Sequence, residues 1–219
     1  MAPRALIWLL LASSLGIGSS AVLAADCVVL DDFSRGRVGE FPLEWKPRKE
    51  SGRPVYTIRE EGGRRFLRAI ARRIGIQAGR EVTWNIETHP IMAWSWRPIE
   101  FPTGSDERKS DANDSVVSVY AVFPNSAVSV KSVKYVWSRV VPAGTHLTSS
   151  AGSTQVRILR SSAQAGQWAD EQVNVREDYR KYFGGSEVPK PGGIAVLTDA
   201  DDTKSRAQGD YANFRVCKP

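Results

Sequence analysis

The sequence predicts an all-β fold, an antiparallel two-sheet sandwich or jelly roll with one short helix. Apolar residues recur at every second position through most of the chain, which is the period of a half-buried strand and not of a helix. Gly, Pro, Asn and Asp separate about ten such segments, a spacing typical of sandwiches and jelly rolls. No Gly/Ser-rich or Pro-rich linker divides the sequence, so we expect a single domain over residues 25–219.

The alternating segments are short and closely spaced. Val55–Glu60 and Phe66–Ala71 flank a Gly62-Gly63 turn, which is typical of a β-hairpin. Arg176–Phe183 lacks the alternation and is followed by two glycines, which predicts a short helix. Further strands are expected at Val82–Ile86, Ile91–Ile99, Val116–Phe123, Lys134–Val140, Thr154–Ser161, Gln172–Val175, Gly193–Thr198 and Tyr211–Val216.

Residues 1–24 have the three parts of a cleavable signal peptide. Arg4 precedes an apolar run over Ala5–Ala12, and small residues complete the segment. The apolar run is too short to cross a hydrocarbon core of ~30 Å, which disfavours a membrane anchor. Cys27 raises lipidation as an alternative, but Asp26 stands where a small residue is expected. We therefore expect cleavage at the end of this segment and a periplasmic or extracellular protein.

The two cysteines, Cys27 and Cys217, lie near the two ends of the expected mature chain. An even number of cysteines in an exported protein predicts one disulfide. Zinc is disfavoured, because His89 and His146 do not complete a ligand set with a recognisable spacing. The formal net charge of +6 favours contact with anionic polymers. Basic residues are spread along the chain without a block of interleaved aromatic residues, so nucleic acid is not expected as a partner.

Three tryptophans are candidates for a ligand platform. Trp94 and Trp96 stand two positions apart in the expected strand Ile91–Ile99, so their side chains point to the same face. Trp137 lies on a strand of its own. Because sugars stack on flat indole rings, we predict that these three side chains contact a glycan. The alternative is that they fill the core, where most tryptophans are largely buried.

Aspartates near both ends of the expected domain predict a calcium site. Asp199 and Asp201 imitate the first positions of a calcium-binding loop, and Asp31 or Asp32 is expected to join them, with Asp210, from the terminal strands. Lys204 stands where an EF-hand requires glycine, so the loop is not an EF-hand. The alternative is a polar turn in which aspartates bond to nearby backbone.

Catalysis is disfavoured by the absence of a recognisable motif. Glu107, Asp170 and Glu171 are the acid/base candidates for a glycan-processing enzyme, which needs two carboxyl groups at a defined separation. Asp170 and Glu171 are adjacent, so they face opposite ways in a strand. The chain has no Glu-x-Asp-x-Glu strand and no Gly-x-Ser-x-Gly motif. Beside Glu107, Arg108 and Lys109 belong either to a solvated loop or to a rim that meets an anionic sugar or lipid headgroup.

Several motifs occur together in one order. They are Trp94–Arg97, Asp106–Lys109, Val119–Phe123, Tyr135–Ser138, Ala165–Trp168, Asp178–Tyr179 and Gly193–Asp199. This order, over Phe33–Val216, resembles the exported bacterial family known as domain of unknown function 3047 (DUF3047), which has no settled biochemical role. The resemblance implies a jelly roll of the carbohydrate-binding-module or concanavalin-like kind, and fold alone does not assign function.

These observations leave three functional hypotheses. The favoured one is a non-catalytic binding module for a glycan or another cell-envelope polymer, with the three tryptophans at the binding face. The second is a glycan-processing hydrolase or lyase that uses the three carboxylates named above. The third is a structural envelope protein with calcium as a staple. No transmembrane segment is expected after cleavage of the leader.

Overall fold

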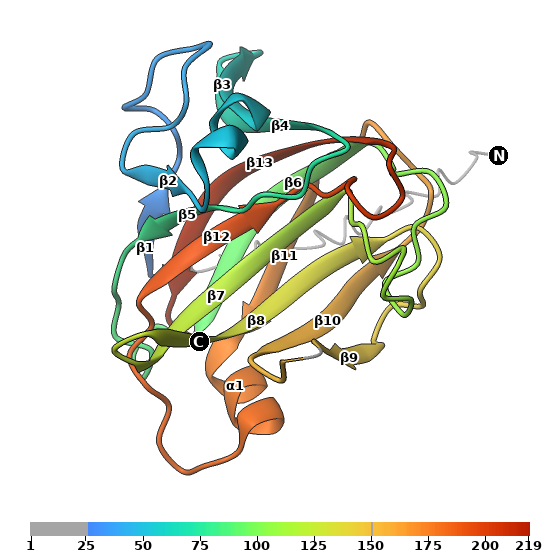
Figure 1. The fold of residues 1–219 in the computed structure, drawn as a ribbon. Coiled ribbons are helices and arrows are strands. Elements are labelled where there is room, and N and C mark those ends of the chain that lie inside the picture. Colours follow the sequence, from blue (N-terminus) through green and yellow to red (C-terminus); the bar gives the residue numbers. More distant parts are fainter. Residues whose placement is uncertain (1–25, 150) are drawn as a thin grey trace, which may run out of the picture.

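The protein is a β-sandwich of two packed sheets (Figure 1). A computed structural model describes residues 26–149 and 151–219, so the leader expected at 1–24 lies outside the described residues. Within these ranges the chain forms thirteen strands, one α-helix and one short 3-10 helix, η1 (Glu50–Val55). In the same part of the chain, no helix combines the length and the apolar content needed to cross a bilayer. The predicted all-β fold class with one short α-helix is confirmed.

The first sheet has six strands in the order β11–β6–β13–β4–β3, with β1 also paired to β13. Its neighbouring strands all run antiparallel. Its strands are β1 (Cys27–Asp31), β3 (Tyr56–Glu61), β4 (Arg64–Arg72), β6 (Ile91–Glu100), β11 (Ala169–Asn174) and β13 (Arg206–Cys217).

The second sheet has seven strands in the order β2–β5–β12–β7–β8–β10–β9. These strands are β2 (Trp45–Pro47), β5 (Ala78–Glu81), β7 (Val117–Ser126), β8 (Ser129–Ser138), β9 (His146–Thr148), β10 (Thr154–Ser161) and β12 (Gly193–Leu197). One pair, β8 with β10, is parallel, which corrects the expectation of purely antiparallel sheets. The chain turns back through β9 after β8, so β10 re-enters the sheet in the direction of β8.

The strand expected at Val82–Ile86 is wrong, because the paired strand in this region is β5, over Ala78–Glu81. Trp84 and Ile86 are nevertheless buried. The apolar alternation therefore predicted which side chains are buried, but it did not predict which residues form the backbone hydrogen bonds of the strand.

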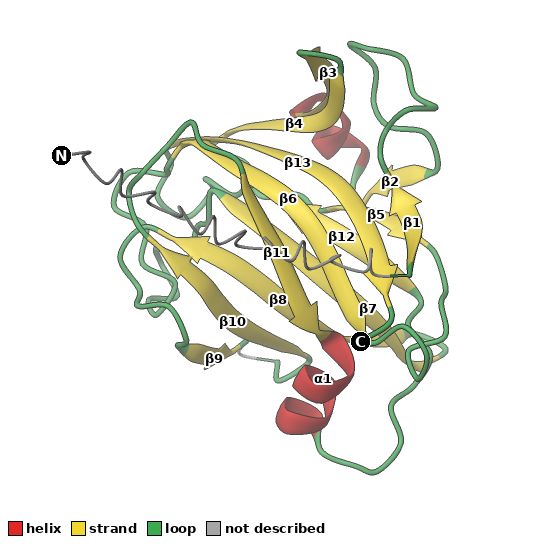
Figure 2. Ribbon diagram, turned by 180° about the vertical axis from the view of Figure 1, so that it is seen from behind, coloured by secondary structure: helices red, strands yellow, loops and turns green. Residues whose placement is uncertain are grey.

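The expected helix is confirmed as α1 (Val175–Phe183), which closes one end of the sandwich (Figure 2). The side chain of Asn174 caps it by accepting a hydrogen bond from the backbone N–H of Glu177, at 3.1 Å. The helix ends at Gly184, whose φ of 74° is a conformation that favours glycine.

The predicted disulfide is confirmed between Cys27 of β1 and Cys217 of β13. These two residues face each other directly in the antiparallel register. The bond closes a loop with a sequence separation of 190 residues. In the chain-entropy model, a loop of this length stabilises the folded state by about 5 kcal/mol, an upper-end figure.

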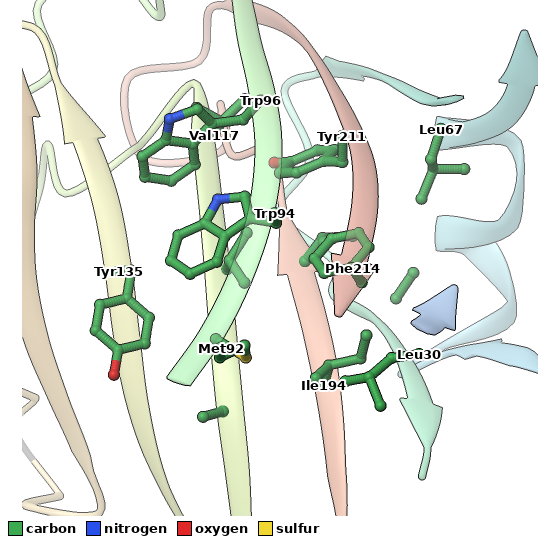
Figure 3. Close-up of a cluster of buried hydrophobic side chains, with 14 of the residues drawn as sticks. Leu30, Leu67, Met92, Trp94, Trp96, Val117, Tyr135, Ile194, Tyr211 and Phe214 are labelled. Atoms are coloured by element: carbon green, nitrogen blue, oxygen red, sulfur yellow. The ribbon is translucent and has the colours of Figure 1, made fainter. Parts of the chain in front are cut away.

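The core lies between the two sheets and is rich in aromatic side chains. Figure 3 shows Trp94, Trp96, Tyr135, Tyr211 and Phe214 in this layer, and each is fully buried. The ring centroids of Trp94 and Trp96 are 5.3 Å apart, and those of Trp94 and Tyr135 are 5.5 Å apart. Side chains of this size bury large apolar areas, which is the main favourable term in folding.

One tyrosine links the two sheets by hydrogen bonds through the core. The Tyr211 hydroxyl, from β13, donates to the backbone carbonyl of Leu197 in β12 at 2.8 Å. It also accepts from the backbone N–H of Ser118 in β7 at 3.2 Å. Both partners belong to the opposite sheet, so this hydroxyl satisfies polar backbone groups that lie away from water.

We expect the substitution Tyr211→Phe to lower the free energy of unfolding by about 1–3 kcal/mol, because it keeps the ring but leaves buried backbone groups without a partner. Urea unfolding followed by tryptophan fluorescence measures this loss. Tyr182→Phe is the matched control, since the Tyr182 hydroxyl makes no hydrogen bond within the described residues. Equal stability of the two variants would contradict the structural role of the Tyr211 hydroxyl.

Candidate functional site

The predicted tryptophan platform is wrong, because Trp94 and Trp96 point into the core (Figure 3). Both have an exposed fraction of 0%. The alternation of β6 places these side chains, with Met92, on the face that the second sheet covers. Trp137 is 6% exposed and packs on Trp96 with 6.0 Å between ring centroids. The core alternative therefore describes Trp94 and Trp96, and Trp137 presents little surface to a ligand.

Two of the predicted acid/base residues serve the packing of β11 on β6. Glu171 accepts a hydrogen bond from the indole Nε1 of Trp96 at 3.0 Å and pairs with Arg160. Asp170, on the other face of the strand, accepts from the hydroxyl of Ser95. Glu171 therefore satisfies a buried indole N–H, and the structure does not bring this pair of carboxylates together with Glu107.

The predicted calcium set is also wrong in part, because arginines neutralise two of its members. Asp31 accepts from Trp45 Nε1 at 2.7 Å and lies 3.0 Å from a guanidinium nitrogen of Arg80. Asp210 is fully buried and bonds to both Arg68 and Arg97, at 2.8 Å each. Carboxylates held by arginine in this way are structural ion pairs, and they do not join Asp199 and Asp201.

We expect Asp210→Asn to destabilise the fold by about 3–5 kcal/mol, because it leaves two arginines without their buried counter-charge. Thermal and urea unfolding measure the loss. Asp26→Asn is the control, since it breaks an exposed ion pair with Lys218 and should leave stability unchanged. If Asp210→Asn instead changed stability only slightly and abolished calcium binding, Asp210 would be a metal ligand as the sequence predicted.

A hollow lies on the outer face of the seven-stranded sheet, and we call it the polar cleft. Its volume is about 540 Å³. Its floor is formed by Tyr120 of β7, Lys134 of β8, Val156 of β10 and Leu197 of β12. Tyr120 lies on the outer face because its neighbours in β7 point into the core.

Side chains from loops and edge strands build the walls of the polar cleft. Glu107, Arg108 and Lys109, from the loop before β7, form one wall, so the alternative of a ligand-facing rim fits this loop. Arg48 and Gln77 line both this cleft and a second hollow of about 260 Å³. The two hollows together extend across the sheet from β2 and β5 to β9 and β10.

A buried ammonium group lies at the centre of the polar cleft. Lys134 is only 8% exposed, and its Nζ lies 5.8 Å from the ring centroid of Tyr120. Burial by itself lowers the pKa of Lys134, but nearby Tyr120, Asp199 and Glu107 outweigh this effect and raise it. Lys134 is therefore a cation at neutral pH, held in a largely desolvated position.

Two carboxyl groups that line the cleft have raised pKa values. Burial raises the pKa of Glu107, while a 2.6 Å hydrogen bond from the Ser138 hydroxyl opposes the rise. Burial likewise raises the pKa of Asp199 to about 8, against the pull of Lys134 and with a contribution from Asp201. The cleft thus combines a cation, two acids and an aromatic ring, which suits the recognition of a polar ligand.

The sequence indicated part of this site and missed the rest. Glu107, Arg108, Lys109 and Asp199 were singled out for their charge, and the structure brings them to one cleft. Lys134 was missed, although a lone lysine between Val133 and Tyr135 in an apolar strand is an available signal. Tyr120 was missed because its pairing opposite Lys134 is a matter of strand register.

Comparisons with known proteins agree with the resemblance in the sequence. A family model described as "Protein of unknown function (DUF3047)" matches residues 43–215. A search of curated proteins finds no match to the chain.

Solved structures with a similar arrangement include two carbohydrate-binding modules and a xylanase. The family 11 carbohydrate-binding module of the cellulase Lic26A-Cel5E of Clostridium thermocellum is 9% identical, with a TM-score of 0.49, over 90% of this chain and 96% of that chain. The family 11 xylanase from Neocallimastix patriciarum is 11% identical, with a TM-score of 0.40, over 90% and 100%. The mannan-recognising module TmCBM27 is 15% identical, with a TM-score of 0.38, over 89% and 99%.

Proposed function

The chain belongs to the DUF3047 family of proteins of unknown function, and we propose that it is a non-catalytic binding module for a glycan or another cell-envelope polymer. The observation that carries this proposal is the polar cleft, with a buried ammonium group on its floor beside an aromatic ring. A cleft of this volume is within the range of ligand sites, about 300–1,000 Å³. We therefore place the binding surface in the polar cleft and not at the tryptophans.

The charges of the cleft favour an anionic polymer. Arg48, Arg108, Lys109 and Lys134 all line it, against the carboxyl groups of Glu107 and Asp199. Lys109 and Arg108 also approach Asp106, so part of their charge is shared with the loop itself. The formal net charge of +6 adds a general attraction for anionic surfaces.

The shape of the cleft favours a chain over a compact molecule. The second hollow continues the polar cleft through Arg48 and Gln77. A linear ligand can therefore lie across several strands and contact Lys134 near the middle of its length. The disulfide supports a role in an oxidising compartment, in keeping with an exported protein whose leader is removed.

We expect Lys134→Gln to weaken binding of an acidic polysaccharide by about tenfold or more, because a charge-assisted hydrogen bond in a desolvated site contributes about 1.5–3 kcal/mol. Isothermal titration of the protein, expressed for export, with polygalacturonate, alginate and neutral dextran measures this. Arg59→Gln is the matched control, since Arg59 is an exposed cation of the six-stranded sheet. Equal losses in the two variants would point to unspecific charge attraction, and no binding by the wild type would favour a structural role.

A glycan-processing enzyme is the second candidate, favoured by the position of Glu107. This carboxyl lines the polar cleft, and its raised pKa is a property of general acids. If the wild type releases reducing or unsaturated sugar ends from a bound polymer, Glu107→Gln should slow the release by about a hundredfold or more. Glu87→Gln, an exposed change away from the cleft, is the control. No release by the wild type leaves the binding module as the function.

A further inference from the structure

Three carboxylates meet beside the polar cleft, where the loop after β12 packs on the segment before β7. One oxygen from each of Asp114, Asp201 and Asp202 lies within 4.8 Å of the others. Backbone bonds hold the two segments together, since the N–H of Asp202 donates to Asp114 Oδ1 at 3.1 Å and the N–H of Thr203 donates to Asp114 Oδ2 at 2.8 Å. Like charges at this separation repel unless a cation lies between them.

A fourth carboxylate points at this group from the interior. Asp199 is 7% exposed, and its Oδ1 has no hydrogen-bond donor within the described residues. A Cβ atom placed on Gly75 would lie 2.0 Å from Asp199 Oδ1 and 2.8 Å from Asp201 Oδ1, so both oxygens pack against this glycine and lie close to each other. A buried carboxylate oxygen without a partner is costly, and a bound cation supplies the missing partner.

We propose that Asp114, Asp199, Asp201 and Asp202 bind one calcium ion. All four offer oxygen, the donor that hard cations prefer, and calcium accepts six to eight such ligands in irregular geometry, with water at the open side. Zinc is a poor fit, because Cys27 and Cys217 form the disulfide and His146 stacks on Tyr182, at 4.2 Å between ring centroids. The inference goes beyond the proposed function and does not rest on it.

The nearby lysines do not neutralise the carboxylates that we assign to this ion. Lys204 donates to the backbone carbonyl of Asp201 at 2.6 Å, so its bond does not occupy a carboxylate of the group. Lys134 has Asp199 and Glu107 as nearby acids, and Asp114, Asp201 and Asp202 are not among the groups that shift its pKa. The ion would tie the loop after β12 to the segment that carries the cleft wall with Glu107, which gives it a structural effect that is measurable without a polymer.

The test is titration of the chelator-treated full chain with calcium chloride, by calorimetry and by thermal unfolding. We expect one ion per chain and a rise in Tm, because an ion that binds only the folded state stabilises it. Asp201→Asn should weaken calcium binding at least tenfold and remove the rise in Tm. Asp32→Asn is the matched control, since it loses one charge on an exposed turn whose hydrogen bond to the N–H of Ser34 an asparagine can keep.

Calcium binding by the wild type and Asp32→Asn, but not by Asp201→Asn, would support the site. No heat and no change in Tm for the wild type would overturn it, as would unchanged binding by Asp201→Asn, which places the ion elsewhere. Equal affinity for magnesium chloride would overturn the assignment to calcium. If Asp201→Asn does not fold, Asp202→Asn gives the same readout with a single change in the same loop.

Discussion

The hydroxyl group of Tyr211 is the interaction on which the rest of this structure depends. It leaves β13 of one sheet and reaches backbone groups of β7 and β12 in the other, so one side chain joins three strands. Each of those backbone groups would otherwise be buried without a partner. These bonds tie the two sheets together at one point of the core, and the aromatic layer with Trp94 and Tyr135 packs between the same sheets.

The position of the polar cleft follows from this link. Leu197 is the last residue of β12, and the next residue, Thr198, donates its hydroxyl proton to the carbonyl of Val116 at 2.9 Å. The N–H of Asp199 then donates to the carbonyl of Ser115, also at 2.9 Å. Consecutive bonds therefore run from the core to the rim, and they place the acidic loop against the segment that leads into β7. Side chains held by such a chain of buried bonds have little freedom to move, which is the preorganisation that a binding site requires.

The sequence predicted those elements whose formation depends on residues close together in the chain. Thr154–Ser161 and the helix with its Asn174 cap and glycine end were recognisable because their chemistry lies within a few residues. The sequence did not reveal which way Trp94 and Trp96 point. Alternation separates the two faces of a strand, but it does not say which face is covered by the other sheet. The parallel pairing of β8 with β10 and the meeting of Tyr120 with Lys134 depend on long-range register, which a single sequence does not encode in any short segment.

The carboxylates of this protein divide into two groups by what surrounds them. Asp31 and Asp210 lie against arginines, and their bonds are complete within the fold, as expected of groups that serve stability. Asp199 is equally buried, yet one of its oxygens has no donor in the described chain, and the nearby ammonium of Lys134 faces the cleft. A fold that completes the hydrogen bonds of some buried carboxyl groups and leaves others incomplete carries a cost at the incomplete ones. Such a cost is common where a ligand completes the set, so this incomplete group is where we expect the proposed calcium ion to bind.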